Sequence, residues 1–304
     1  MKTTDLILTA AAPAIWGSTY LVTSEMLPAT HPITLAGLRA LPSGLVLLLL
    51  VRQLPPKDWY AKVIALSLLN IGIFWPMLFI AAQRLPGGQA ATLGAIQPLI
   101  VIVLARLLLA TRILPMAIVA AGLGIVGVAL LVLSPDAQLD PLGLLAALAG
   151  TMSMALGTVL YRRWSPPVSP TVFTAWQLTI GGSLLCIIAL LFEPPTLTLN
   201  PTNLIAIGYL GFIGAGLTLI IWQRGLTRLP PAIVSTLGLL SPTAAVILGW
   251  VVLNQTLTPK DWGGIGLILL SVWLCQRAYN RSTPMRKPPP EPSTTPRPAC
   301  VSPH

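Results

Sequence analysis

Polar side chains in this sequence interrupt stretches that otherwise consist of alanine, leucine, isoleucine and valine. Gln97 and Ser241 each precede a proline, in LGAIQP (93–98) and LGLLSP (237–242). A proline inside a helix removes one backbone hydrogen bond, so a carbonyl one turn earlier is left for another donor. Such a carbonyl, with an amide or hydroxyl nearby, could bind a small solute by hydrogen bonds. The alternative is a packing kink that a neighbouring helix satisfies.

The remaining candidates lie within the predicted apolar stretches, and several of them lie near the predicted middle. Polar groups are costly in hydrocarbon, so they should face the protein interior. Their mixture of aromatic, amide and hydroxyl groups suits a small amphipathic solute. Serine and threonine can instead bond to their own helix. The predicted substrate-binding residues are Trp16, Tyr20, Arg39, Asn70, Trp75, Thr92, Gln97, Thr158, Gln177, Thr218 and Ser241, with Pro98 and Pro242 as helix-breaking or gating residues.

Arg39 is the most informative of these residues, because a cation lies about 9 Å inside the outer end of its stretch by helical rise. It either extends outward to anchor the helix on loop carbonyls or presents its donors to a carboxylate. Tryptophans closer to the ends of stretches, namely Trp59, Trp164, Trp222 and Trp262, are predicted to be interfacial anchors.

Composition explains why so few polar residues stand out. Hydrophobic residues make up 55% of the 304 residues and charged residues 9%, with a mean hydropathy of +0.82. A soluble domain would carry about 25% charged residues. The sequence therefore predicts an all-α integral membrane protein, since the apolar runs do not alternate as barrel strands would. The predicted ten transmembrane helices cover residues 5–24, 33–52, 59–82, 87–109, 113–133, 142–161, 171–192, 203–224, 231–253 and 260–279.

The basic residues are unevenly distributed between the connecting segments. Ten spans from a cytoplasmic N-terminus place 14 of the 18 lysines and arginines on the cytoplasmic side. The positive-inside rule therefore predicts that both termini are cytoplasmic. Residues 281–304 are rich in proline and basic residues and are predicted to form a disordered tail. The formal net charge of +10 thus indicates the lipid bilayer as partner, not nucleic acid.

The sequence also contains an internal repeat. A shift of 144 residues aligns residues 84–115 with 228–259, with ten of 32 positions identical, including three prolines. Residues 1–135 and 136–280 are therefore predicted to be two related halves of five helices each. An odd number of helices makes the second half enter the membrane from the opposite side. Such inverted repeats are typical of secondary transporters whose substrate site lies near the midplane.

These features resemble a known family, the EamA branch of the drug/metabolite transporter (DMT) superfamily. The resemblance rests on Trp16-Gly17-Ser18, on Arg39 and on the small-residue-then-proline fourth helix of each half. It covers roughly residues 5 to 279 and implies export of small metabolites, often amino acids, across a bacterial inner membrane. The family pattern often ends each fourth helix in Gly-Glu, whereas this chain has Ala110-Thr111 and Asn254-Gln255. That departure bears on the subfamily.

Other function classes fit less well. An enzyme is disfavoured because HExxH is absent and His31 and His304 are the only histidines. A channel would favour a continuous polar pore lining. Neither a metal site nor a cofactor is predicted, and no obligate protein partner is expected. Acidic residues are absent from the predicted helix centres, so facilitated transport of a small-molecule substrate is favoured over proton coupling. Amino-acid export is the leading function; export of drugs or other metabolites is the alternative.

Overall fold

The computed structural model describes residues 3–28, 30–84, 93–132, 140–194, 196–254 and 256–282, and the regular elements in these ranges are helices. They include one short 3-10 helix, η1, and two π-helical segments, η2 and η3. In chain order the elements are α1 (Thr3–Met26), α2 (Pro32–Val51), η1 (Lys57–Trp59), α3 (Tyr60–Ser67), η2 (Leu68–Ile73), α4 (Phe74–Arg84), α6 (Gln97–Leu109), α7 (Pro115–Val132), α8 (Pro141–Trp164), α9 (Pro170–Phe192), α10 (Pro201–Gly208), η3 (Tyr209–Leu217), α11 (Thr218–Arg228), α12 (Pro231–Leu237), α13 (Leu240–Leu253) and α14 (Pro259–Ser282).

Several helices begin with a proline, where the missing N–H has no intrahelical partner to lose. Side-chain caps add to this start signal. Asp140 accepts a hydrogen bond from the backbone N–H of Gly143, and Asn200 forms a reciprocal capping box with Asn203. These caps fix where the helices of the second half begin.

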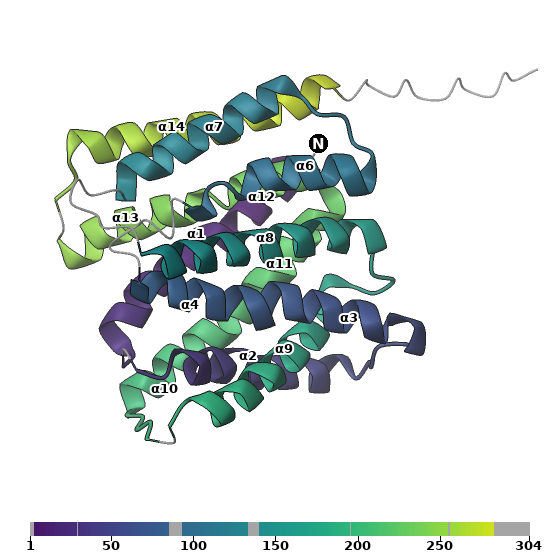
Figure 1. Ribbon diagram of the computed structural model, residues 1–304, viewed down its shortest axis with the longest axis vertical. Coiled ribbons are helices and arrows are strands. Elements are labelled where there is room, and N and C mark those ends of the chain that lie inside the picture. The colour runs from purple at the N-terminus through teal and green to yellow at the C-terminus, as the bar shows by residue number, and fades with distance from the viewer. Residues whose placement is uncertain are drawn as a thin grey trace, which may run out of the picture.

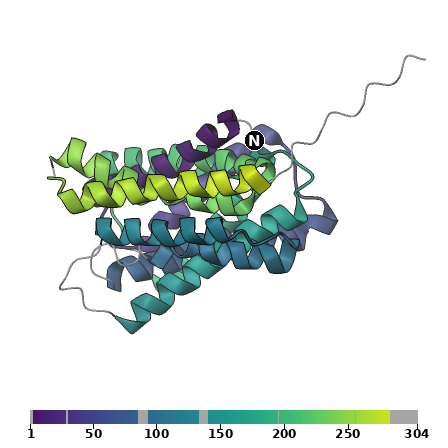
Figure 2. The same cartoon turned by 90° about the horizontal axis from the view of Figure 1, so that it is seen from above.

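The helices lie roughly side by side in one bundle (Figure 1). At one edge α7 packs along α14, and at the opposite edge α2 packs along α9, with α1, α4, α6, α8 and α11 between them (Figures 1 and 2). α1 also packs on α13 and on α11, while α8 packs on α6 and on α4. Many extensive contacts therefore join a helix from residues 1–135 to one from 136–280.

Glycines allow these long-range helix pairs to approach closely. A Cβ atom on Gly44 of α2 would lie 2.5 Å from the backbone nitrogen of Thr179 in α9. A Cβ atom on Gly127 of α7 would lie 2.9 Å from the Gly264 carbonyl oxygen of α14. Small residues let membrane helices gain dispersion and hydrogen-bond energy where no hydrophobic driving force acts between them.

Seven helical runs are long and apolar enough to span a membrane among the described residues. Two further apolar helices, Gln97–Leu109 and Pro115–Leu131, are shorter. The expectation of a helical membrane protein is thus met, and helical elements overlap all ten predicted stretches. The predicted tail lies outside the described residues except for its first two positions.

One end of the bundle gathers basic side chains, and we call it the basic end. It holds Arg52, Lys57, Arg162, Arg224 and Arg228, at the ends of α2, α8 and α11 and at the start of η1. Contacts between these elements bring them together: the Arg162 guanidinium donates to the Leu226 and Thr227 carbonyls.

The basic end is closed by a large apolar cluster that includes Trp59, Tyr161, Phe173, Trp176 and Trp222. The Trp59 and Trp222 side chains are only 6% and 3% exposed. The prediction that these two tryptophans are interfacial anchors is therefore wrong, because aromatic residues from several helices pack against one another there. Trp262, by contrast, is 54% exposed.

Candidate functional site

Four of the predicted binding residues meet in a group that we call the central cluster, formed by Trp16, Arg39, Trp75, Thr218 and the carbonyl of Gly214. The Trp16 Nε1–H donates to Thr218 Oγ1 at 2.8 Å and to the Gly214 carbonyl oxygen at 3.2 Å. Arg39 Nη2 donates to the same carbonyl at 3.1 Å. The cluster thus joins α1, α2 and α4 to η3 and α11.

The Arg39 guanidinium reaches the interior of the bundle. Its guanidinium carbon lies 4.8 Å from the centroid of the Trp75 ring, and its nitrogen reaches the backbone of η3 inside the bundle. A cation over an indole face is attracted by the ring quadrupole. Binding of a carboxylate by Arg39 stays a prediction, because the acceptor in the structure is a backbone carbonyl.

A π-helical segment provides the acceptor on which the cluster depends. Gly214 lies within η3, and its carbonyl also accepts from Thr218 Oγ1 at 2.8 Å. The wider π-helical turn is common at functional sites because it alters the regular backbone hydrogen bonds. Sequence analysis missed this acceptor, since a glycine carries no side chain that could mark it.

Asn70 of η2 packs against α8, the helix that also carries Thr158. The Asn70 amide occupies the space that a side chain on Gly157 would fill, because a Cβ there would lie 1.9 Å from Asn70 Oδ1. Within the described ranges, Asn70 Oδ1 and Thr158 Oγ1 are buried and have no hydrogen-bond partner. Buried acceptors of this kind are costly unless a water or a ligand meets them.

The two predicted helix breaks are both present. Turns at residues 95–96 and 238–239 interrupt the helix just before Gln97-Pro98 and Ser241-Pro242. The Gly238 carbonyl, which Pro242 cannot bond, accepts from the Ser241 N–H at 3.1 Å. The expectation of a freed carbonyl is therefore not met at Gly238, because the turn tightens to an i−3 bond.

The two polar residues before the prolines have different surroundings. The Gln97 Nε2 amide is buried without a partner among the described residues. The Ser241 carbonyl lies against α1, where a Cβ on Gly17 would be 2.8 Å away. Ser241 thus adjoins the turn of α1 that carries Trp16.

Gln177 lies apart from the central cluster, in a buried network toward the basic end. Its Nε2 donates to the Leu66 carbonyl at 3.0 Å, and its Oε1 accepts from Gln223 Nε2 at 2.5 Å. Gln223 Oε1 in turn accepts from Thr174 Oγ1 at 3.0 Å. Fully paired amides of this kind hold α9, α11 and α3 together.

Two predicted residues cannot be placed: Thr92 and the side chain of Tyr20 lie outside the described part of the protein. Two residues that were not predicted do contribute. Ser18 Oγ and Tyr209 Oη are 2.7 Å apart and join α1 to η3. The pairing could not be foreseen, because the two residues are 191 positions apart.

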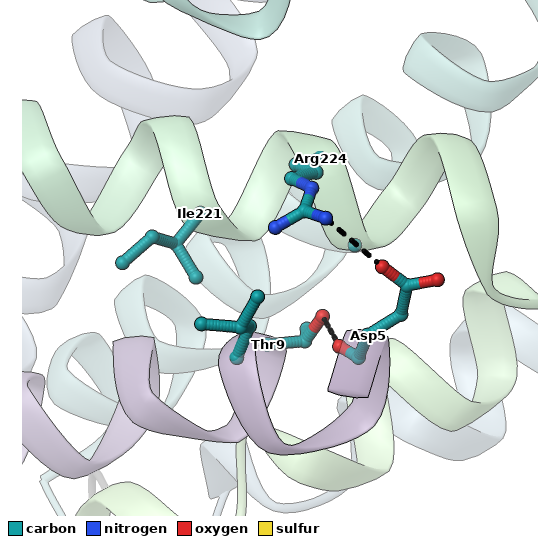
Figure 3. Close-up of a pocket in the computed structure, with 6 residues that line it drawn as sticks. Asp5, Thr9, Ile221 and Arg224 are labelled. Atoms are coloured by element: carbon teal, nitrogen blue, oxygen red, sulfur yellow. Dashed lines mark hydrogen bonds and ion pairs between the residues drawn. The ribbon is translucent and has the colours of Figure 1, made fainter. Parts of the chain in front are cut away.

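Hollows occur at both ends of the bundle. At the basic end, Asp5 of α1 and Arg224 of α11 point toward one another beside Thr9 and Ile221 (Figure 3). At the opposite end, an open hollow of about 430 Å³ is lined by Glu25, Thr198, Asn200 and Asn203, among other residues of the ends of α1 and α10.

Known proteins resemble this chain over nearly its whole length. Residues 4–133 and 141–276 match the EamA-like transporter family. Protein PecM of Dickeya dadantii is 43% identical over 267 residues, which cover 87% of this chain and 90% of that protein. The uncharacterized inner membrane transporter YedA of Escherichia coli K12 is 29% identical over 266 residues, 86% of each chain.

A solved crystal structure shares the fold, with a TM-score of 0.78 and 20% identity over 93% of this chain and 100% of its own. The family match extends over most of the sequence, and the helices that carry the central cluster lie inside it. This chain therefore belongs to the EamA-like transporter family of the DMT superfamily and is a membrane transporter.

Proposed function

We propose that this protein exports amino acids or chemically similar small metabolites, which bind at the central cluster and cross by alternating access. One observation carries the proposal. The Arg39 guanidinium, stacked over Trp75 and bonded to the Gly214 carbonyl, places a positive charge and an aromatic surface together inside an apolar bundle.

The chemistry of the cluster supports a solute with one anionic and one apolar group. A guanidinium forms strong charge-assisted hydrogen bonds with a carboxylate. The Trp16 and Trp75 rings offer apolar surface beside the guanidinium. The Trp16 ring also packs against the Trp222 ring, with the two centroids 5.0 Å apart. Asn70 Oδ1 and Thr158 Oγ1 are further acceptors for an ammonium group.

We infer that two inverted repeats, residues 1–135 and 136–280, supply the helices around this site. The packing pairs support the inference. The packing of α1 on α13 corresponds to that of α8 on α6, and the packing of α1 on α11 corresponds to that of α8 on α4. The two stretches that match the family, 4–133 and 141–276, support the same division. Similar halves can exchange conformations at similar energy, as alternating access requires.

The proposed location is a bacterial inner membrane with both termini in the cytoplasm. The beginning of α1 and the end of α14 lie toward the same end of the bundle (Figure 1), and the basic end carries Arg162, Arg224 and Arg228. Basic residues favour the cytoplasmic side. In this orientation the 430 Å³ hollow beside Glu25 faces outward.

Transport is proposed to be facilitated. The acidic residues of the sequence lie at helix ends, in connecting segments and in the tail, and a buried carboxylate is the usual proton relay of coupled carriers.

The test is counterflow in proteoliposomes that contain the purified protein and a trapped amino acid. Each of the twenty amino acids is added as a competitor, and uptake is measured with and without a pH gradient. We expect saturable counterflow by amino acids. Its rate with the pH gradient should stay within about twofold of the rate without it. Strong acceleration by the gradient would refute facilitated transport, and no counterflow by any amino acid would refute the proposed substrate.

The second candidate is export of hydrophobic compounds without a carboxylate. The tilted pair of Trp16 and Trp222 favours it, because two adjoining indole rings bind apolar solutes irrespective of charge. Competition by neutral aromatic compounds but not by amino acids in the same assay would favour this candidate.

A further inference from the structure

Two groups of ion pairs lie at opposite ends of the bundle and join equivalent helices. At the basic end, Asp5 of α1 is 2.9 Å from Arg228 and 3.2 Å from Arg224 of α11. At the other end, Asp140 at the start of α8 is 3.6 Å from Arg84 at the end of α4. Each pair thus links the start of one helix to the end of another across the two halves.

The arginines of the two pairs are equivalent positions of the internal repeat. Arg84 and Arg228 each begin an Arg-Leu-Pro sequence, and the 144-residue shift places one on the other. Each arginine ends the third helix of its half and meets an aspartate at the first helix of the other half. An arginine–aspartate contact between the equivalent helices is therefore made at each end, although the two aspartates are not equivalent positions of the repeat.

The two groups of ion pairs differ in the exposure of the aspartate and in its number of partners. The Asp5 side chain is 11% exposed and has two arginine partners, while the Asp140 and Arg84 side chains are 36% and 48% exposed. Aromatic residues such as Trp59, Tyr161 and Trp222 surround the helix ends at the basic end. Where α4 meets α8, the core cluster consists of the three alanines Ala81, Ala146 and Ala147 with a few partly buried neighbours. Among the described residues, the basic end is the more tightly packed of the two.

We propose that Asp5 with Arg224 and Arg228, and Asp140 with Arg84, are the two gates of the transport cycle, and that the structure represents the state closed at the basic end. The proposal rests on the alternating access put forward above. Opening toward the basic end separates α1 from α11 and breaks the Asp5 pairs, while α8 closes on α4 and shortens the Asp140 pair. Because the two groups join equivalent pairs of helices at opposite ends of the bundle, a loss at one end is offset by a gain at the other.

The experiment compares the accessibility of a thiol placed behind the Asp5 gate. Thr9 is 1% exposed, lines the hollow beside Asp5 and Arg224, and lies against Gly225 (Figure 3). Thr9→Cys is introduced into a protein whose natural cysteines are replaced by alanine. An impermeant maleimide is then applied to vesicles from the side on which the basic end is exposed.

We expect Asp5→Asn to increase the labelling rate of the Thr9→Cys thiol about fivefold, the factor that corresponds to loss of an ion pair of about 1 kcal/mol. Asp58→Asn removes an exposed acid from the same end and is expected to leave the rate unchanged. Asp140→Asn weakens the gate at the other end, so labelling should stay the same or fall.

A second reporter separates gating from loss of structure. The second reporter thiol is introduced by Ser271→Cys. Ser271 lies in α14, fully buried against α7 and away from the ion pairs. The proposal is overturned if Asp5→Asn leaves the Thr9→Cys rate unchanged, if it raises labelling of both reporters alike, or if Asp140→Asn raises labelling of Thr9→Cys.

Counterflow by the unmodified protein distinguishes the gates from the proposed function. If counterflow occurs and Asp5→Asn does not change labelling, transport stands and these gates are wrong. If the labelling pattern is as expected but no amino acid exchanges, the gates stand and the proposed substrate is wrong.

Discussion

The two π-helical segments of the protein occupy matching places in the repeat but carry different polar groups. The 144-residue shift places 68–73, which is η2, on 212–217 within η3, and it places Asn70 on Gly214. At Gly214 the backbone carbonyl accepts from Trp16, Arg39 and Thr218. At Asn70 the side-chain Oδ1 has no partner among the described residues.

The difference teaches that two segments with the same π-helical backbone can carry different chemistry. The segment in the second half uses its carbonyl to hold Arg39 and Trp16 in place. The segment in the first half leaves a buried amide oxygen that a solute could meet. If the proposed solute meets both segments, the Gly214 side is already organised and the Asn70 side is completed by the solute, which limits the reorganisation that binding requires.

Removal of Arg39 should have the largest effect on transport, because Arg39 is the cation that the Gly214 carbonyl holds in position. We expect Arg39→Ala to lower counterflow at least tenfold, since a charge-assisted hydrogen bond is worth about 1.5–3 kcal/mol. Arg39→Lys keeps the charge but loses the planar stack on Trp75. Its counterflow rate should therefore lie between those of the wild type and of Arg39→Ala. Wild-type rates in Arg39→Ala would remove Arg39 from the site.

Glycine-to-alanine changes test the two segments separately. A Cβ on Gly157 would lie 1.9 Å from Asn70 Oδ1, so Gly157→Ala must displace the Asn70 amide. A Cβ on Gly214 would have no neighbour closer than 3.7 Å, so Gly214→Ala is the matched control. We expect Gly157→Ala to destabilise the protein by about 1–3 kcal/mol through overpacking and Gly214→Ala to be near neutral.

The measurement is the midpoint of thermal unfolding in detergent together with counterflow. Equal stability of the two alanine variants would show that the contact between Asn70 and Gly157 is not tight.

The ends of the fourth helices allow a finer comparison of the halves. Ala110 and Asn254 end α6 and α13 with φ angles of 54° and 52°, in the left-handed region that glycine adopts without strain. Alanine pays about 1 kcal/mol there, whereas asparagine tolerates it better. We therefore expect Ala110→Gly to raise stability by up to about 1 kcal/mol, and Asn254→Gly to change it by less.

The same unfolding midpoints check this pair. A larger gain in Asn254→Gly than in Ala110→Gly would contradict the assigned strain.

The smallest effect on stability is expected for Asn70→Leu, which tests the role of an oxygen that is unpaired within the described ranges. Replacing an acceptor without a partner by an apolar group of similar shape should change the free energy of unfolding by less than about 0.5 kcal/mol. Counterflow should fall about threefold if Asn70 meets the solute. Unchanged counterflow with unchanged stability would show that Asn70 Oδ1 does not meet the solute.

The sequence predicted the helical segments well because apolar length and proline are local signals. Pro32, Pro115, Pro141 and Pro259 each begin a helix within one or two residues of the expected start. It also predicted that Trp16, Arg39, Trp75 and Thr218 matter, since each is polar or aromatic at depth. It placed Gln177 in the same site, yet that amide bonds to Leu66 and Gln223 elsewhere.

By itself, the sequence determined what each helix contains and how far each polar residue lies from the ends of its helix, because a rise of 1.5 Å per residue converts position into distance along the helix. Only the tertiary structure decided which residues face one another. Trp16 meets Gly214 and Thr218 across 198 and 202 residues of chain, and the contact depends on how α1 is rotated against η3 and α11. Rotation and neighbours are set by close packing at glycines and by π-helical turns, and neither leaves a periodic signal in the sequence.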